Sequence, residues 1–257
     1  MLNVTRIPAF ADNYLWLLRR ANSSAAVAVD PGDAAAIIAP LEAHHWHLSD
    51  ILLTHHHRDH IGGVAELKTR YDCRIWGPAQ ETIADVDVTL HGNEVISVGD
   101  LGDLQVLSVP GHTRGHIAYC IGDALFSGDV LFGAGCGRLF EGTAAQQWQS
   151  LQRLSSMRDS TDVYCAHEYT LANLRFAVSI EPDNPDLLVR LEQVQHRRQR
   201  GEATVPLNLG EEKRTNPFLR GHEKALQQRV AVLTGRPIDN ALMCFTELRR
   251  LKDQFKA

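Results

Sequence analysis

The sequence has few of the features that define membrane proteins or nucleic-acid binders. No apolar run reaches the roughly 18 residues that indicate a transmembrane helix. The formal net charge at pH 7 is −5, so the chain as a whole does not attract polyanions. We therefore expect neither a membrane partner nor a nucleic-acid partner.

Cysteine is scarce and is not spaced for structural chemistry. The five cysteines are odd in number, scattered and never arranged as C-x-x-C, which argues against a disulfide framework and against a sulfur-ligated zinc site. Within residues 1–20, Pro8, Asp12 and Asn13 interrupt any signal-type hydrophobic region. We expect reduced thiols and a cytoplasmic protein. The cysteines are Cys73, Cys120, Cys136, Cys165 and Cys244.

The first part of the chain alternates strand-like and helix-like patterns. Residues 34–45 and the stripe of Ile61, Val64 and Leu67 have helical periodicity. Between them lie short aliphatic runs that end at Gly, Pro or Asp, as strands do. This alternation predicts an α/β domain whose helices cover its sheet faces. The strand-like runs are "NYLWLL", "AAVAVDPGD", "DILLTHHH", "CRIWGP", "VISVGD", "LQVLSVPGH" and "ALFSGDVLF".

The later part of the chain has a mostly helical pattern. Asn184, Pro185 and Gly201 form a complete set of start and stop signals for one helix. A last helix has a possible cap at Asp239 or Asn240 and then repeats apolar residues with helical spacing. We therefore predict an α/β domain over residues 1–169 and a smaller helical domain over residues 170–257. The apolar stripe of the last helix is Leu242, Phe245, Leu248, Leu251 and Phe255.

Residues 52–63, "LLTHHHRDHIGG", concentrate imidazole and carboxylate groups. If the preceding strand continues through this segment, His55 and His57 point to one side, and His56 points to the other. Asp59 and His60 then lie in a turn and point elsewhere, which suits a second metal ion better than extra ligands on the first. The pattern predicts two half-sites, each of which needs further ligands.

Three later residues are suitable ligands. His112 in "VPGHTRGH", Asp129 in "LFSGDVLF" and His167 in "VYCAHEY" each stand where a strand gives way to a loop. Imidazole nitrogens combined with carboxylates favour zinc, iron or manganese over magnesium or calcium. The sequence thus predicts a metal site built from distant segments.

The segment "THHHRDH" fits the T-H-x-H-x-D-H signature of the metallo-β-lactamase superfamily. Within that superfamily the chain resembles glyoxalase II, the hydroxyacylglutathione hydrolases, through "GCGRLFEGT", "AHEYT", "NPF" and "LRRLKDQFK". The resemblance implies an α/β (α+β) fold, a four-layer αββα sandwich with metals at one edge, followed by a small helical domain that helps to bind the substrate.

The resemblance also implies a binuclear metal centre. It assigns His55, His57 and His112 to the first metal, and it assigns His116 no ligand role. The cofactor we expect is two divalent metal ions, zinc in the first place and iron or manganese as alternatives. The remaining ligands are Asp59, His60 and His167 on the second metal, with Asp129 bridging both.

A thioester suits such a centre. Paired metals lower the pKa of a bound water towards about 7 and stabilise a tetrahedral oxyanion. A thioester expels a thiolate whose conjugate acid has a pKa of about 8.5, so no separate general acid is required. The resemblance implies hydrolysis of S-D-lactoylglutathione to glutathione and D-lactate, the second step of methylglyoxal detoxification. The catalytic carboxylates are Asp59 and Asp129, together with a metal-bound hydroxide.

Glutathione carries two carboxylates, so its site should be cationic. Arg249 and Lys252 are three apart on the last helix and match the family's glutathione-binding positions. Arg138 and Tyr169 also match such positions. Many eukaryotic members have a tyrosine where Phe140 stands, and the hydroxyl contact of that tyrosine is missing here.

Other interpretations remain open at this point. The alternatives are another superfamily hydrolase, a mononuclear-iron persulfide dioxygenase, an RNA phosphodiesterase and a non-catalytic metal-binding module. The set of Asp59, His60 and His167 favours two metals, and the net acidity argues against RNA. We expect a monomer that acts on a small glutathione thioester. His44, His45 and His47 are expected to close a helix without binding metal, and Asp30 is explained by its turn.

Overall fold

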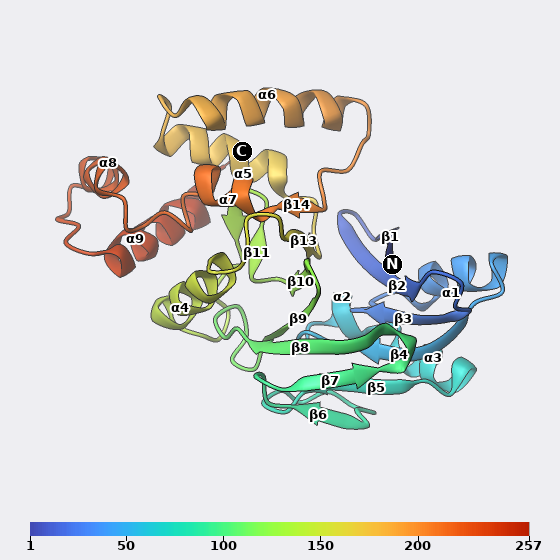
Figure 1. Ribbon diagram of the computed structural model, residues 1–257. Coiled ribbons are helices and arrows are strands. Elements are labelled where there is room, and N and C mark those ends of the chain that lie inside the picture. The colour runs from blue at the N-terminus through green and yellow to red at the C-terminus, as the bar shows by residue number, and fades with distance from the viewer. Residues whose placement is uncertain (257) are drawn as a thin grey trace. The chain divides into compact units, whose positions relative to one another are not determined.

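The computed structural model describes residues 1–256, which form two compact units (Figure 1). Unit 1 comprises residues 1–109 and 113–128. Unit 2 comprises residues 110–112 and those from Asp129 onward. The predicted boundary between residues 169 and 170 separates a catalytic domain from a substrate-binding domain, whereas the two units are defined by compactness. That boundary stays a prediction. Among residues 1–256, no helix is both long and apolar enough to cross a membrane.

Unit 1 contains two β-sheets. In the first sheet β1, β2 and β3 are antiparallel, and β3 to β6 run parallel. In the second sheet β7 to β10 form an antiparallel series. The first sheet consists of β1 (Leu2–Ala9), β2 (Asn13–Arg20), β3 (Ala25–Val29), β4 (His47–Leu52), β5 (Arg74–Pro78) and β6 (Val88–Leu90). The second includes β7 (Val95–Val98), β8 (Gly102–Ser108), β9 (Ile117–Ile121) and β10 (Ala124–Gly128), with the short 3-10 helix Gly99–Leu101 between β7 and β8.

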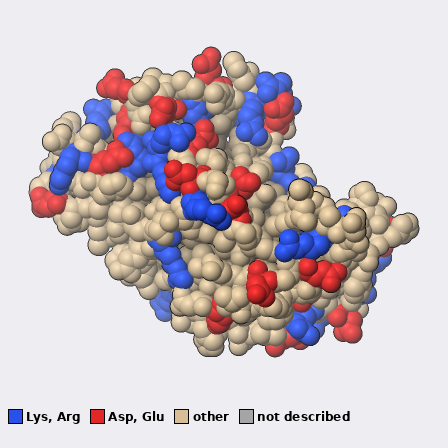
Figure 2. Space-filling model, viewed as in Figure 1, with Lys and Arg blue, Asp and Glu red and all other residues tan. Residues whose placement is uncertain are grey.

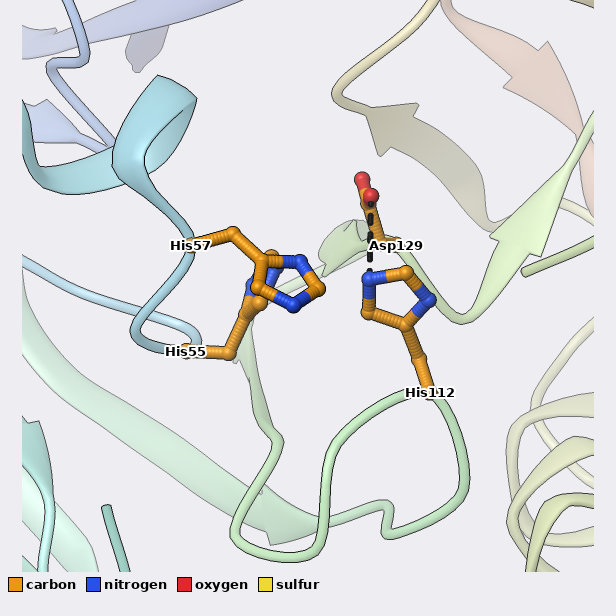
Figure 3. Close-up of side chains that lie close together, drawn as sticks. All are labelled: His55, His57, His112 and Asp129. Atoms are coloured by element: carbon orange, nitrogen blue, oxygen red, sulfur yellow. Dashed lines mark hydrogen bonds and ion pairs between the residues drawn. The ribbon is translucent and has the colours of Figure 1, made fainter. Parts of the chain in front are cut away.

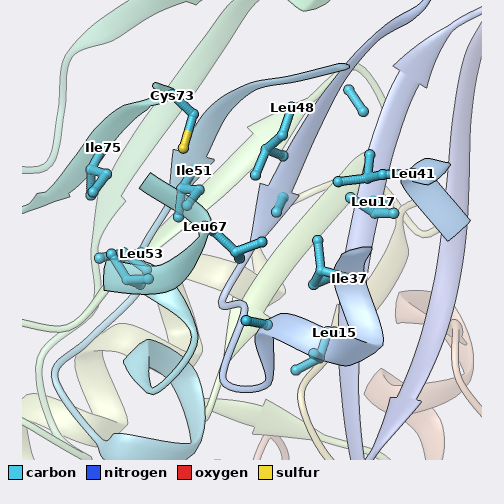
Figure 4. Packing of buried hydrophobic residues seen from close by; sticks show 14 residues of the cluster. Leu15, Leu17, Ile37, Leu41, Leu48, Ile51, Leu53, Leu67, Cys73 and Ile75 are labelled. Carbon is cyan, nitrogen blue, oxygen red and sulfur yellow. The ribbon is translucent and has the colours of Figure 1, made fainter. Parts of the chain in front are cut away.

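Helices α1 (Ala34–Ala43) and α3 (Val64–Tyr71) contribute to the core on one face of the first sheet (Figure 4). The side chain of Asp33 accepts the Ala36 N–H and starts α1. Ile37 and Leu41 lie one turn apart and are fully buried there. Full burial of one such aliphatic side chain contributes about 1.5–3 kcal/mol. This packing holds the strand that leads into the histidine segment.

The second sheet is tied to the first by hydrogen bonds. The Tyr119 hydroxyl on β9 donates to the Leu53 carbonyl at 2.7 Å. Arg20 on β2 donates through Nη2 to the Leu101 carbonyl at 2.6 Å. Unit 1 therefore provides a helix layer and two sheet layers of the predicted four.

Unit 2 is mainly helical. Its strands are the hairpin of β11 (Leu131–Phe132) and β12 (Gly135–Cys136) and the antiparallel pair of β13 (Asp162–Cys165) and β14 (Leu207–Asn208). Its helices are α4 (Ala144–Ser155), α5 (Thr170–Ile180), α6 (Pro185–Gln199), α7 (Leu209–Thr215), α8 (Lys224–Thr234) and α9 (Ala241–Gln254).

The predicted signals of two helices are confirmed. The Asn184 side chain accepts the N–H groups of the first turn of α6, Pro185 is its first residue, and Gly201 follows its end with φ 71°. Asn240, one of two predicted candidates, caps α9 by accepting the Met243 N–H at 2.9 Å. Local capping chemistry determines both helix starts.

The histidines at the end of α1 differ from the prediction in one respect. His44 is the C-cap of α1, and His45 has a left-handed backbone with φ 55°. His47 is the first residue of β4, so the expectation that it closes the helix is wrong. The left-handed residue ends the helix early and redirects the chain into the strand.

Candidate active site

The histidine segment follows β4 as a loop. β4 ends at Leu52, so the expectation that the strand continues through residue 57 is wrong. Nε2 of His55 nevertheless lies 3.0 Å from Nδ1 of His57 (Figure 3). His56 contacts Glu81 through both its backbone N–H and its ring Nδ1. The pairing arises from a loop conformation instead of strand alternation.

Asp59 and His60 lie on the one-turn helix α2 (Arg58–Ile61). Oδ2 of Asp59 accepts a hydrogen bond from Nδ2 of Asn13 at 2.9 Å and lies 3.6 Å from Nε2 of His60. His60 is only 1% exposed. Gly32 permits this helix to approach, because a Cβ at its position would lie 1.7 Å from the Asp59 carbonyl oxygen. The approach also places α2 beside the Asp30 turn.

Asp30 orients two of these imidazoles. Its carboxylate accepts the Thr54 N–H at 2.8 Å and the Thr54 hydroxyl at 2.7 Å. Because that hydroxyl proton is donated, Oγ1 accepts from Nδ1–H of His55 at 3.0 Å. Nδ1 of His60 also lies 3.0 Å from Oδ2 of Asp30. We infer that the His55 ring carries its proton on Nδ1 and keeps a lone pair on Nε2.

Unit 2 has a second set of potential ligands around Asp129. Asp129 follows the last residue of β10 and is 6% exposed. Its Oδ2 lies 3.4 Å from Nε2 of His112 (Figure 3), and its Oδ1 lies 3.5 Å from Nε2 of His167. Nδ1 of His112 lies 2.8 Å from the Arg138 carbonyl, which can only accept, so this nitrogen holds the proton.

The arrangement around Asp129 fits metal ions. A lone pair on Nε2 of His112 faces a carboxylate oxygen, and a cation between them removes the repulsion. Two ligands on a tetrahedral ion with bonds of about 2.1 Å are separated by about 3.4 Å. The two Asp129 distances match that edge, one at each carboxylate oxygen. Buried imidazoles and carboxylates, with their distal nitrogens already bound, are the donors expected for two divalent metals.

A cavity of about 400 Å³ lies within unit 2. It brings together all four residues that the sequence proposes for glutathione, and it also includes two proposed metal ligands. Three of its side chains are cationic, which makes the cavity suitable for an anionic ligand. The cavity is lined by His112, Asp129, Phe132, Cys136, Arg138, Phe140, Tyr169, Ala172, Asn173, Arg249 and Lys252.

Aromatic rings pack against the ligand imidazoles in this cavity. The ring of Tyr169 stacks on His167 with a centroid distance of 4.7 Å and an interplanar angle of 1°. Phe140 meets His112 edge to face at 5.2 Å and is 60% exposed. These contacts restrict both imidazole planes. They leave the exposed part of the Phe140 ring at a position where a tyrosine would present a hydroxyl.

The three cations of the cavity differ in environment. Arg138 is largely exposed, with a side-chain exposure of 59%. Burial, followed by the nearby Arg249 charge, lowers the pKa of Lys252, whose ammonium lies 5.6 Å from the centroids of two phenylalanine rings. Arg249 is buried, and its guanidinium lies over the Phe218 ring at 5.2 Å. Their roles are therefore not equivalent.

Two residues that support the site were missed or underestimated. The turn assignment of Asp30 overlooked its contacts with Thr54 and His60. Glu81 was not identified at all, because "WGPAQE" has no motif that marks its carboxylate. His116 was expected to be structural, and its ring stacks on His55 at 4.6 Å. Asp30 and Glu81 are recognised by the closeness of their carboxylates to histidines in the folded chain, and sequence spacing does not reveal that closeness.

Comparisons with known proteins give one family for both parts of the chain. The metallo-β-lactamase superfamily model matches residues 13–87, and the model of the hydroxyacylglutathione hydrolase C-terminus matches residues 168–255. A hydroxyacylglutathione hydrolase of Alkalilimnicola ehrlichii is 51% identical over 255 residues, which cover 99% of this chain and 100% of that protein. One of Pseudomonas fluorescens is 48% identical over 257 residues, with coverage of 99% and 100%.

Solved structures share the fold. ETHE1 from Myxococcus xanthus has a TM-score of 0.66 at 25% identity, with 95% of this chain and 99% of that chain covered. The BLEG-1 B3 metallo-β-lactamase has a TM-score of 0.65 at 23% identity, with coverage of 85% and 99%. The predicted metallo-β-lactamase fold class is confirmed.

Proposed function

Because the chain belongs to the hydroxyacylglutathione hydrolase family of the metallo-β-lactamase superfamily, we propose that it hydrolyses S-D-lactoylglutathione to glutathione and D-lactate. The observation that carries the proposal is the cavity of unit 2. There His112 and Asp129, with donor atoms suited to a metal, line the same walls as Arg138, Arg249 and Lys252. The thioester carbonyl of the substrate would lie at the end of the cavity with His112 and Asp129. The carboxylates of its glutathione part would lie at the cationic end.

The proposed metal ligands are those that the sequence predicts. His55, His57 and His112 would hold one of two divalent ions. We propose zinc for both. When bound, two such ions lower the pKa of a water and polarise the substrate carbonyl. The other ion would be held by Asp59, His60 and His167, and Asp129 would be a ligand of both.

The protein's own residues orient the reactants. The Arg138 carbonyl and the Phe140 edge fix the His112 ring, and the stacked Tyr169 fixes the His167 ring. The cationic side chains attract the carboxylates of glutathione, which positions the thioester carbonyl for attack by water. The leaving group is a thiolate, so no side chain has to protonate it.

A metal analysis combined with an activity assay tests this proposal. We expect close to two metal ions per chain and metal-dependent loss of the thioester absorbance of S-D-lactoylglutathione. Removal of metal with a chelator should abolish the activity, and added zinc should restore it. A fully loaded protein that leaves this thioester intact would overturn the assignment.

Additional assays on the same protein separate the alternatives. A ratio of one iron per chain with oxygen consumption on a glutathione persulfide would indicate the dioxygenase. Nuclease activity with Mn²⁺ or Zn²⁺ would indicate the phosphodiesterase. On the face shown in Figure 2, basic and acidic side chains are interspersed instead of forming one basic surface, which favours the small substrate. Metal binding without turnover of any thioester would indicate a non-catalytic module.

Compartment and assembly complete the proposal. All five cysteines are buried thiols outside any disulfide, which is compatible with a reducing cytoplasm. We propose that the protein acts as a monomer. Light scattering on the purified protein should give the mass of a monomer, and a dimer mass would contradict this part.

A further inference from the structure

Asp253 lies near the end of α9 and connects two of the cationic side chains. Its Oδ1 accepts Nη2 of Arg249 at 2.8 Å and Nε of Arg249 at 3.2 Å. The same oxygen lies 3.5 Å from Nε of Arg138. One carboxylate oxygen therefore serves two guanidinium groups at the cationic end of the cavity.

The other side of Arg249 is also bound within the chain. Nη1 donates to the Cys136 carbonyl at 2.9 Å and lies 3.7 Å from the Cys136 sulfur. Cys136 belongs to β12, and Arg138 follows two residues later. Asp253 and Cys136 thus hold one buried guanidinium from opposite sides, and Arg249 links α9 to the segment that carries Arg138.

We propose that Asp253 is a positioning residue, which fixes Arg249 and through it the Cys136–Arg138 segment, so that Arg138 and Lys252 receive the substrate carboxylates. This inference deepens the proposed function and rests on it. The N–H groups of Arg249 are directed at Asp253 and Cys136, which fixes the position of its charge beside Lys252. The exposed Arg138 is free to exchange its long contact with Asp253 for a substrate carboxylate.

The direction of the change in KM distinguishes this positioning role from a simple effect of charge. Loss of an acidic side chain raises the local positive potential, which by itself improves binding of an anion. Loss of a positioning contact releases Arg249 and loosens the segment that carries Arg138, which weakens binding. Positioning therefore predicts a higher KM for an Asp253 variant, and charge balance predicts a lower one.

The test compares Asp253→Ala, Asp253→Asn and Asp253→Glu in the metal-loaded enzyme. We expect Asp253→Ala to raise KM about tenfold with kcat nearly unchanged, because a charge-assisted contact on the binding cation is lost. Asp253→Asn keeps an acceptor and should lie between Asp253→Ala and the wild type. Asp253→Glu keeps the charge and should recover part of the affinity. A KM for Asp253→Ala equal to or below that of the wild type overturns the proposal.

Glu247→Gln is the matched control. Glu247 lies on the same helix and accepts hydrogen bonds from Arg236 and Arg250, so its neutralisation changes the charge of α9 without touching the cavity cations. We expect its KM to stay at or slightly below the wild-type value. Comparable rises in KM for Glu247→Gln and Asp253→Asn would show a general effect on the helix and overturn the specific role.

A second readout does not depend on the substrate. In the wild type, burial raises the pKa of the Cys136 thiol to about 11 and limits its alkylation. Asp253→Ala should accelerate alkylation of Cys136 by iodoacetamide several-fold more than Asp253→Asn, which removes the same charge but keeps an acceptor; the rates are measured by peptide mass spectrometry, and Glu247→Gln should leave them unchanged. If the wild type fails to hydrolyse the thioester, the proposed function fails, and this labelling still decides whether Asp253 positions the segment. Unchanged labelling of Cys136 overturns the proposal.

Discussion

Replacement of Glu81 should destabilise the histidine segment. The Glu81 side chain is 2% exposed, and its Oε2 accepts the backbone N–H and the ring Nδ1 of His56, each at 2.6 Å. Its Oε1 accepts the Gly115 N–H at 3.0 Å and the Thr113 hydroxyl. One buried carboxylate therefore joins the segment of residues 55–60 to the segment of residues 113–116.

The magnitude follows from the donors that Glu81→Ala leaves without an acceptor. The His56 ring and the Thr113 hydroxyl can rotate, but the backbone N–H groups of His56 and Gly115 cannot. A buried donor left unpaired costs about 1–3 kcal/mol, so we expect a loss of about 3 kcal/mol in the free energy of unfolding. For a chain of this size that corresponds to a fall of about 10 °C in Tm.

Thermal unfolding of the metal-free protein is the appropriate assay, because bound metal would add its own stabilisation. Glu81→Gln should lose about half as much, since its amide keeps one acceptor and presents donors on the other side. Glu192→Gln, an exposed change of the same type in the middle of α6, is the control and should leave Tm unchanged. A metal-free Glu81→Ala that melts within about 2 °C of the wild type would refute the reasoning.

Three further changes test the metal and substrate sites. Asp30→Asn should weaken zinc binding about 10–100-fold in a chelator competition, because His60 loses the carboxylate that faces its Nδ1. Gly137→Ala should also lower zinc affinity at least tenfold in the same assay, because its Cβ would lie 1.9 Å from the Asp129 carbonyl oxygen. The pKa of Lys252 is lowered from 10.5 by burial and then by a neighbouring cation. The kcat/KM should therefore fall as the pH rises through that lowered pKa, because the ammonium loses its charge.

Each of these changes has a control. Asp33→Asn alters the cap of α1 and should spare zinc affinity, whereas equal losses for Asp30→Asn and Asp33→Asn would contradict the role of Asp30. Gly122→Ala introduces a Cβ that meets nothing within 4 Å and should also spare zinc affinity. Lys252→Met should remove the alkaline decline in kcat/KM, and a decline that persists would assign it to another group.

The fold was predictable where local chemistry determines it. The caps at Asn184 and Asn240 and the proline at the start of α6 are signals within a few residues of the helix starts they control. The end of β4 was not predictable in the same way. The strand ends at Leu52, which forms its last pair with β5 at Trp76. The sequence of the histidine segment gives no information about that pairing.

The candidate site shows the same limit. The proposed ligands of residues 55–60 share one short motif, so their spacing alone suggests metal chemistry. Glu81 contacts His56, 25 residues before it, and Gly115, 34 residues after it, and only the folded chain brings these segments together. Asp253 resembles any charged residue on an exposed helix face until its distance to Arg249 is known. Assignment of the metal ligands themselves stays a prediction.

The acceptors behind the imidazoles differ in kind. His60 has a carboxylate behind its ring, whereas His112 has a neutral carbonyl. An imidazole backed by a carboxylate is the more basic donor, so the proposed ligand sets hold their ions with unequal strength. A chelator would then remove the ions in a fixed order instead of both at once. Partial depletion would yield a uniform one-metal species, whose activity could be measured separately from that of the fully loaded protein.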